Sequence, residues 1–301
     1  MIPDCFSSRS SVELSATVTV AAMDARSYRQ IIAERFAHLD TTALLSATGK
    51  DGSLSIPPRF LDLRLGNQCN LRCIMCQWPT SSSWARHGIL DPWRSDEEFF
   101  SRFLALAPHL ERLYFAGGEP LLQPAHHRII QDLITSNHAH HIELAYSTNL
   151  TVLPGWCAEA WPRFARVDLG VSCDGVGPLF ERIRVGARWD RFLENLQQVR
   201  QLPIAVRIAV TPQEANLEEL PALVRWASQE DLCLDLSNIL QYPPRLSLAA
   251  AGPARLSRVQ EELTALLPAL SEAARAPVHA LLGVFEQLIS PLPAPQPAQR
   301  S

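Results

Sequence analysis

The sequence has 301 residues, of which 47% are hydrophobic and 19% are charged, so its composition is that of a folded globular protein. A formal net charge of −4 and a pI near 6.1 give no overall attraction to nucleic acid or to anionic membranes. There is no apolar run of about 18 residues and no secretion-signal pattern at the N-terminus, so we expect a cytoplasmic protein with neither nucleic-acid nor membrane partners.

The first part of the chain has a mixed pattern. It is rich in serine near its start, has a short helical pattern around 28–36, and reaches a Gly/Asp/Ser turn near 49–53. We therefore expect residues 1–56 to be an N-terminal extension that is partly disordered.

From residue 57 the pattern becomes regular. Short β-rich apolar runs lie at about 59–65, 111–115, 141–147, 166–172, 204–210 and 233–240, and amphipathic helical patterns lie at about 95–107, 124–137, 156–163, 189–201 and 216–229. This alternation predicts right-handed βαβ units in a parallel sheet whose strands are buried on both faces. Six units predict an α/β fold, a partial (β/α)6 barrel of parallel strands, with its chemistry at the carboxyl ends of the strands.

The C-terminal part continues without further strand patterns. We expect residues 57–245 to form the core domain and 246–290 a C-terminal helical segment, with helices at about 255–273 and 277–289. Residues 291–301 are proline-rich and are expected to be a disordered tail.

Three of the seven cysteines fall within eight positions, directly after the first predicted strand. Cys69, Cys73 and Cys76 have the spacing C-x₃-C-x₂-C, which suits a [4Fe-4S] cluster in which each thiolate takes one iron and one iron stays open to another ligand. A structural zinc ion is the alternative, but it needs a fourth protein ligand, for which His87 is the nearby candidate.

The run from Cys69 to Cys76 resembles the signature loop of the radical S-adenosylmethionine (SAM) superfamily. The resemblance implies that the open iron binds SAM, and that reduction of the cluster cleaves SAM to a 5′-deoxyadenosyl radical. In the family an aromatic residue often precedes the third cysteine and packs on the adenine. Met75 takes that position here, and it is apolar without offering ring stacking.

The second predicted strand runs into Gly117-Gly118-Glu119-Pro120. Paired glycines allow a close backbone approach, and a Glu can accept hydrogen bonds from an ammonium group. The segment resembles the family's Gly-Gly-Glu-Pro element, which implies that the glycine backbone and Glu119 receive the SAM amine. The alternative is a plain β-turn.

The next strands end at Asn149 and at Ser172-Cys173-Asp174-Gly175. Ser172 and Asp174 alternate on one face of the strand, so both can point toward the mouth of the barrel. This resembles the Ser-x-Asp-Gly segment of peptide-modifying members, in which the serine contacts SAM, and Ile183-Arg184 resembles an Ile-Arg element of the same branch. Arg184 is accordingly the candidate partner of the SAM carboxylate. Helix capping is the alternative for Asn149, Ser172 and Asp174.

Residues 236–244 also resemble the twitch or SPASM branch, whose C-terminal extension holds an auxiliary cluster. Cys233 is the last cysteine of this chain, so we expect one cluster and no auxiliary one. Cys157 is a weak candidate for donating a hydrogen atom to a substrate radical, with a buried free cysteine as the alternative.

These features predict a radical SAM enzyme of natural-product biosynthesis, an oxidoreductase or isomerase. The Ser-x-Asp-Gly resemblance favours a ribosomally made peptide as substrate, with a small sugar or amino-acid intermediate as the alternative. Without an auxiliary electron acceptor, a redox-neutral reaction such as epimerisation is favoured. The family implies an electron donor such as flavodoxin or ferredoxin. A non-catalytic, metal-stabilised binding protein is the competing hypothesis of another class.

Overall fold

The computed structural model describes residues 56–78, 80–84, 89 and 96–290. Within these, one sheet has the strand order β1-β3-β4-β5-β7-β8, and every neighbouring pair is parallel. The strands are β1 Phe60–Leu63, β3 Arg112–Phe115, β4 Glu143–Thr148, β5 Arg166–Ser172, β7 Ala205–Ala209 and β8 Cys233–Asp235. The expected partial barrel of parallel strands is confirmed, whereas the expectations for 1–55 and the tail lie outside the described residues.

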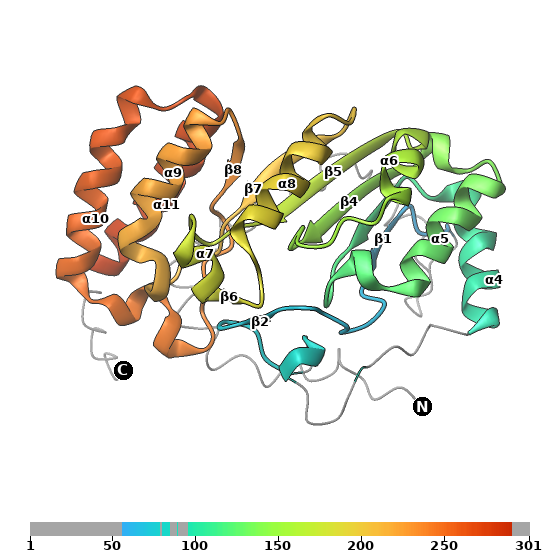
Figure 1. Ribbon diagram of the computed structural model, residues 1–301, viewed down its shortest axis with the longest axis horizontal. Coiled ribbons are helices and arrows are strands. Elements are labelled where there is room, and N and C mark those ends of the chain that lie inside the picture. The colour runs from blue at the N-terminus through green and yellow to red at the C-terminus, as the bar shows by residue number, and fades with distance from the viewer. Residues whose placement is uncertain (1–55, 79, 85–88, 90–95, 291–301) are drawn as a thin grey trace, which may run out of the picture.

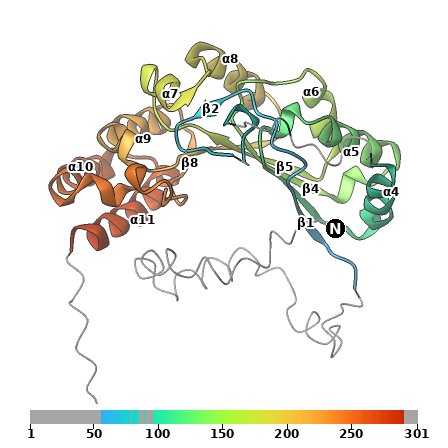
Figure 2. The same cartoon turned by 90° about the horizontal axis from the view of Figure 1, so that it is seen from below.

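The helices between the strands cover one side of the sheet, which is curved into an arch in Figure 2. They are α4 Glu97–Leu106, α5 Pro124–Thr135, α6 Trp156–Ala160, α7 Pro178–Ile183, α8 Trp189–Arg200 and α9 Leu220–Gln229. Local sequence fixes where they begin. The Asp96 carboxylate, for example, accepts the N–H of Phe99 at 2.9 Å and caps α4, and α5 begins with Pro124 in its first turn.

The two faces of the sheet differ in chemistry. On the convex face, under the helices, side chains such as Leu113, Phe115 and Leu169 are at most 1% exposed. On the concave face the alternate residues are polar and half-buried, among them Tyr114 and Asp168. The expectation of strands buried on both faces was therefore wrong, because the helices of the described chain pack against one face only and the alternation of each strand follows from that.

A small antiparallel ribbon was not expected from the sequence. The two-residue strands β2 Arg72–Cys73 and β6 Arg184–Val185 pair with each other, so that Cys73 lies opposite Arg184. Figure 1 shows the ribbon below the main sheet. It joins the cysteine loop to the segment that follows α7, although the two are more than a hundred residues apart in the chain.

Two C-terminal helices close the β8 edge of the sheet. α10 Pro253–Leu266 packs on α9, and α11 Glu272–Ile289 packs on α10, α9 and β8. The break between them falls near Pro268 rather than at the expected 273–277, because Pro277 is accommodated within α11. In the described part of the chain, no helix has the length and apolar character to span a membrane.

Candidate active site

The cysteine loop lies at the carboxyl ends of the strands and is tied to the β2–β6 ribbon. Beyond the Cys73–Arg184 pair, the N–H of Ile74 donates to the carbonyl of Ile183 at 2.9 Å. Cys73 is buried, and Cys69 and Cys76 are half-buried. The backbone therefore holds three thiols in a fixed loop with limited access to water.

Hydrogen-bond donors surround the sulfur atoms. The Leu71 N–H donates to Cys69 Sγ at 3.4 Å, Asn149 Nδ2 lies 3.9 Å from the same sulfur, and Arg184 Nη1 lies 4.0 Å from Cys73 Sγ. Donors and a cation at these positions suit thiolate ligands, so the residues present fit an iron-sulfur cluster held by the three cysteines.

The thiols of Cys73 and Cys76 interact with each other. A hydrogen bond between them lowers the pKa of Cys76, while that bond and burial raise the pKa of Cys73. No three His, Cys, Asp or Glu side chains of the described residues converge on a single point that would suit one metal ion. His87, the fourth ligand suggested for zinc, lies outside the described residues.

The serine-rich segment at 81–84 holds the cysteine loop through hydrogen bonds, and it was not predicted from the sequence. Ser82 Oγ accepts the N–H of Cys69 at 3.1 Å, and the Ser83 hydroxyl donates to the Cys69 carbonyl at 2.9 Å. Trp84 Nε1 donates to the Cys73 carbonyl at 3.0 Å, and its ring carries the Arg72 guanidinium 4.2 Å from its centroid. The cluster of serines before a tryptophan, shortly after the third cysteine, was the available signal.

The two glycines of the Gly-Gly-Glu-Pro turn pack against the backbone that leads into Cys69. Gly117 has φ +115°, and a Cβ there would lie 2.7 Å from the Gly66 carbonyl oxygen. A Cβ on Gly118 would lie 2.3 Å from the Gln68 carbonyl oxygen, and the Glu119 N–H donates to that oxygen at 2.7 Å. Both positions therefore require glycine for contact with the cysteine loop itself.

Glu119 is buried, with three donors around its carboxylate. Thr148 Oγ1 and the Asn149 N–H each donate to it at 2.7 Å, and the Leu121 N–H donates at 3.2 Å. Burial raises the pKa of Glu119 to about 7. That Glu119 receives the SAM amine stays a prediction, and in this structure the side chain joins the turn after β3 to the end of β4.

Asn149 connects the end of β4 to the cysteine loop rather than capping the next helix. Its Nδ2 donates to Asn70 Oδ1 at 3.1 Å and points toward Cys69 Sγ, while its Oδ1 accepts the N–H of Thr151 at 2.9 Å. The Nδ2 end of the side-chain amide therefore contacts the loop around the first cysteine, and the Oδ1 end fixes the turn to Thr151.

Asp174 and Arg184 form a buried ion pair. Arg184 Nη2 lies 2.7 Å from Asp174 Oδ2, the two side chains are 8% and 0% exposed, and the Thr211 N–H donates to the other carboxylate oxygen at 2.7 Å. Burial raises the pKa of Asp174, and the charge of Arg184 opposes that effect. Asp174 thus orients Arg184 beside Cys73 instead of pointing freely into the barrel mouth.

The remaining residues expected at the site differ in their location and burial. Ser172 is half-buried at the end of β5, and Met75 is half-buried on the cysteine loop. Cys157 is fully buried in α6, in the helix layer, so the structure supports the alternative of a core cysteine over a hydrogen-atom donor on the concave face.

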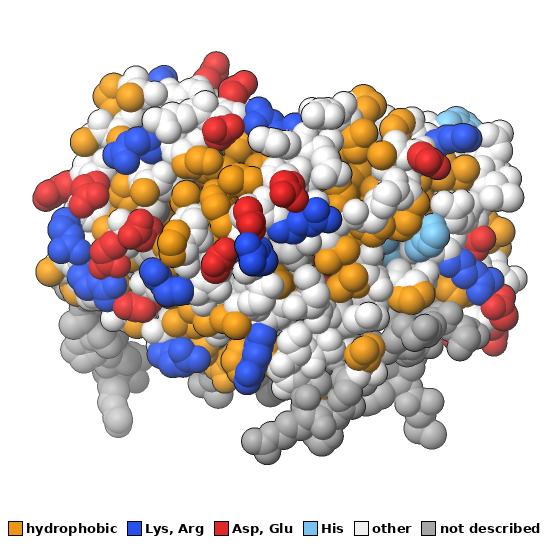
Figure 3. Space-filling view, in the orientation of Figure 1, with side chains coloured by type: hydrophobic (Ala, Val, Ile, Leu, Met, Phe, Trp, Pro, Cys, Tyr) orange, Lys and Arg blue, Asp and Glu red, His pale blue; other side chains and the backbone are white. Residues whose placement is uncertain are grey.

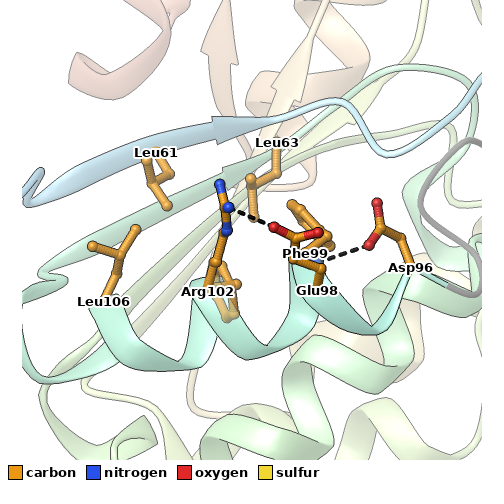
Figure 4. A pocket seen from close by; sticks show the side chains of 8 residues that line it. Leu61, Leu63, Asp96, Glu98, Phe99, Arg102 and Leu106 are labelled. Atoms are coloured by element: carbon orange, nitrogen blue, oxygen red, sulfur yellow. Dashed lines mark hydrogen bonds and ion pairs between the residues drawn. The ribbon is translucent and has the colours of Figure 1, made fainter.

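A cavity of about 490 Å³ lies elsewhere, between β1 and α4. Figure 4 shows its apolar lining of Leu61, Leu63 and Leu106, with the Glu98–Arg102 ion pair at its edge. Leu61 and Leu63 point to the helix side of the sheet, so this cavity does not open onto the concave face below the cysteine loop.

The model of the radical SAM superfamily matches residues 63–227, more than half of the chain. The chain belongs to the radical SAM superfamily. Members of this superfamily use a [4Fe-4S] cluster and SAM, which agrees with the expected cofactors.

Curated relatives are 28–29% identical to this radical SAM chain over the aligned residues. GTP 3′,8-cyclase from Bradyrhizobium diazoefficiens is 29% identical over 190 residues, which cover 60% of this chain and 52% of that protein. GTP 3′,8-cyclase from Rhodopseudomonas palustris is 28% identical over 235 residues, which cover 67% of this chain and 66% of that protein. The chain spans between half and two thirds of the length of these relatives.

Solved structures share the fold of this radical SAM chain. Native anSMEcpe with bound AdoMet has a TM-score of 0.53 at 19% identity, covering 69% of this chain and 59% of that chain. Streptococcus suis SuiB has a TM-score of 0.52 at 15% identity, covering 83% of this chain and 59% of that chain. At these identities the likeness concerns the fold alone.

Proposed function

We propose that this chain is an enzyme that cleaves SAM reductively and abstracts a hydrogen atom from a substrate bound against the concave face of the sheet. A cluster held by Cys69, Cys73 and Cys76 would supply the electron that cleaves SAM into methionine and a 5′-deoxyadenosyl group able to take a hydrogen atom from the substrate. The observation that carries the proposal is the loop of Cys69, Cys73 and Cys76, fixed by backbone contacts at the strand ends.

The residues around the loop have separate roles in this proposal. Arg184, oriented by Asp174, places a positive charge beside Cys73 and offsets the negative charge of thiolate ligands. Glu119 is a positioning residue that holds Thr148 and Asn149 against the loop. Neither side chain needs to touch SAM for its loss to disturb the site.

We assign the contacts to SAM to polar groups that make no other hydrogen bond within the described residues. Within the described residues, no N–H group donates to the carbonyl oxygens of Gly117 and Gly118, which leaves them as acceptors for the SAM amine. The Ser172 hydroxyl likewise makes no hydrogen bond to the described chain and is assigned to SAM. Met75 is assigned to the adenine, as an apolar side chain next to the third cysteine.

For the substrate, two sources of similarity point in different directions. The Ser-x-Asp-Gly segment favours a ribosomally made peptide, and one matched structure holds anSMEcpe with AdoMet and the Cp18Cys peptide. The curated relatives are named for a cyclase of GTP, which favours a small molecule instead. We propose the peptide first and the small molecule second. Incubation with each class and mass spectrometry of the product separates them.

The remaining expectations are part of the same proposal. Residues 57–245 form the catalytic core, 246–290 close its β8 edge, and the electron comes from a carrier such as flavodoxin or ferredoxin. Within the described residues we assign one cluster, to Cys69, Cys73 and Cys76, because Cys157 and Cys173 are buried in the core and Cys233 is an exposed cysteine on β8.

The experiment is a search for 5′-deoxyadenosine after anaerobic reconstitution with iron, sulfide, SAM and a chemical reductant. The natural chain should form it, and Cys73→Ala should not. Cys233→Ala is the matched control, because Cys233 is an exposed cysteine on β8 and its loss should leave the yield unchanged. A natural chain that binds metal yet forms no 5′-deoxyadenosine would favour the non-catalytic binding protein.

A further inference from the structure

One row of residues crosses the concave face directly below the proposed SAM site. Ser147 on β4, Gly170 on β5 and Arg207 on β7 are neighbours in register. The row lies two residues before Ser172 on β5, which is about 6.6 Å along the strand. A substrate with a C–H bond next to SAM therefore meets this row.

Arg207 lies over Gly170 and is held by two carboxylates. It forms an ion pair through Nη1 with Asp168, and its Nε lies 3.6 Å from Asp235 Oδ2. A Cβ on Gly170 would lie 3.1 Å from Arg207 Nη2, so the missing side chain makes room for the guanidinium. The side chain of Arg207 is 27% exposed, too little for a freely solvated arginine.

The Nη2 group of Arg207 is the unused part of this arrangement. Within the described chain, Nη2 makes no hydrogen bond, whereas Nη1 pairs with Asp168 and Nε lies 3.6 Å from Asp235 Oδ2. If Arg207 served stability alone, Asp168 would be a sufficient partner for its charge. Here a planar guanidinium is held in one orientation, and the two N–H groups of Nη2 are left over on the concave face.

A second set of donors lies on the other side of Gly170. The hydroxyls of Ser147 and Tyr114 are 2.6 Å apart and share one hydrogen bond, which leaves one of the two O–H groups to donate elsewhere. Ser147 is half-buried on the concave face. A guanidinium fork and a hydroxyl, separated by a residue without a side chain, form a donor set for an anion.

We propose that Arg207, positioned by Asp168 and Asp235, and the Ser147–Tyr114 hydroxyl pair bind an anionic group of the substrate, either a carboxylate or a phosphate. The inference rests on the proposed function, since it takes the concave face as the substrate's place. It narrows the substrate to a molecule that carries such a group near the reacting C–H bond.

The test uses the reconstituted full chain with SAM, titrated calorimetrically with pyrophosphate and, separately, with N-acetylglutamate. Binding of pyrophosphate alone identifies a phosphate site, and binding of N-acetylglutamate alone identifies a carboxylate site. Arg207→Gln should weaken the bound probe at least tenfold. Arg207→Lys, which keeps the charge but loses the fork, should also weaken it while preserving the fold.

Arg166→Gln is the matched control, because Arg166 is an exposed arginine on the same face of β5, at the opposite end of the strand. It should bind the probe as the natural chain does. Binding of neither probe, or equal losses for the Arg166 and Arg207 variants, would overturn the inference. Formation of 5′-deoxyadenosine without substrate should persist in the Arg166 variant, and its absence from the natural chain would instead reject the proposed function.

Discussion

The two faces of one sheet carry different tasks in this protein. On β3, Leu113 and Phe115 face the helices and are at most 1% exposed, whereas Tyr114 between them faces the concave side and bonds to Ser147. β5 repeats the pattern with Leu169 and Asp168. Stability therefore depends on one set of alternating residues and the proposed chemistry on the other, although both sets belong to the same strands.

Neighbouring residues of β3 give the sharpest test of this division. Phe115 packs against His126 and Tyr146, with ring centroids 4.5 and 5.3 Å away, so Phe115→Ala should lower the free energy of unfolding by about 3–5 kcal/mol. Tyr114→Phe removes one half-buried hydrogen bond and should cost about 1 kcal/mol. Denaturant unfolding of the two variants measures both changes in free energy. Equal losses would contradict the division of tasks between the two faces of the sheet.

The charged side chain of Arg184 is nearly as buried as the apolar side chains of the core. Arg184→Gln leaves Asp174 without its counter-charge, so we expect a loss of about 3 kcal/mol in unfolding free energy. Adding Asp174→Asn removes the stranded charge and should restore part of that loss. The double-mutant cycle measures the coupling, and additive losses would show that the pair does not act as a unit.

Glu119 should make the stability of the cluster-free protein depend on pH. Its folded pKa, about 7, lies above the ordinary value of 4.5, so its contribution is complete below about pH 4.5 and is lost as the pH rises through 7. Glu119→Gln should remove a slope of at most about 1.4 kcal/mol per pH unit in that window. Urea unfolding at pH 5, 6, 7 and 8 measures it, and an unchanged slope would contradict the assignment.

Much of the fold and the centre of the site follow from local patterns. The run expected at 166–172 is β5, Arg166–Ser172, because its apolar residues alternate and a helix pattern follows. The cysteines are identified by spacing, and parallel strands bring their carboxyl ends together. These features need no knowledge of distant contacts.

Long-range pairing is what the sequence does not reveal. The β2–β6 ribbon has two residues per strand, too short for any periodic signal, and the pairing of Asp174 with Arg184 depends on it. The position of Arg207 beside Asp168 follows from the register of β7 on β5, which no local pattern specifies. For the same reason Glu119 was expected to face a ligand, and its three donors were not foreseen.

The central claim is that the loop of Cys69, Cys73 and Cys76 holds a cluster with one iron open to SAM. Electron paramagnetic resonance of the reduced, reconstituted protein, with and without SAM, tests it most directly. We predict about four irons per chain by iron analysis of the same sample, and a resonance signal of the cluster that changes when SAM is added. A signal from four irons that SAM leaves unchanged would contradict the claim.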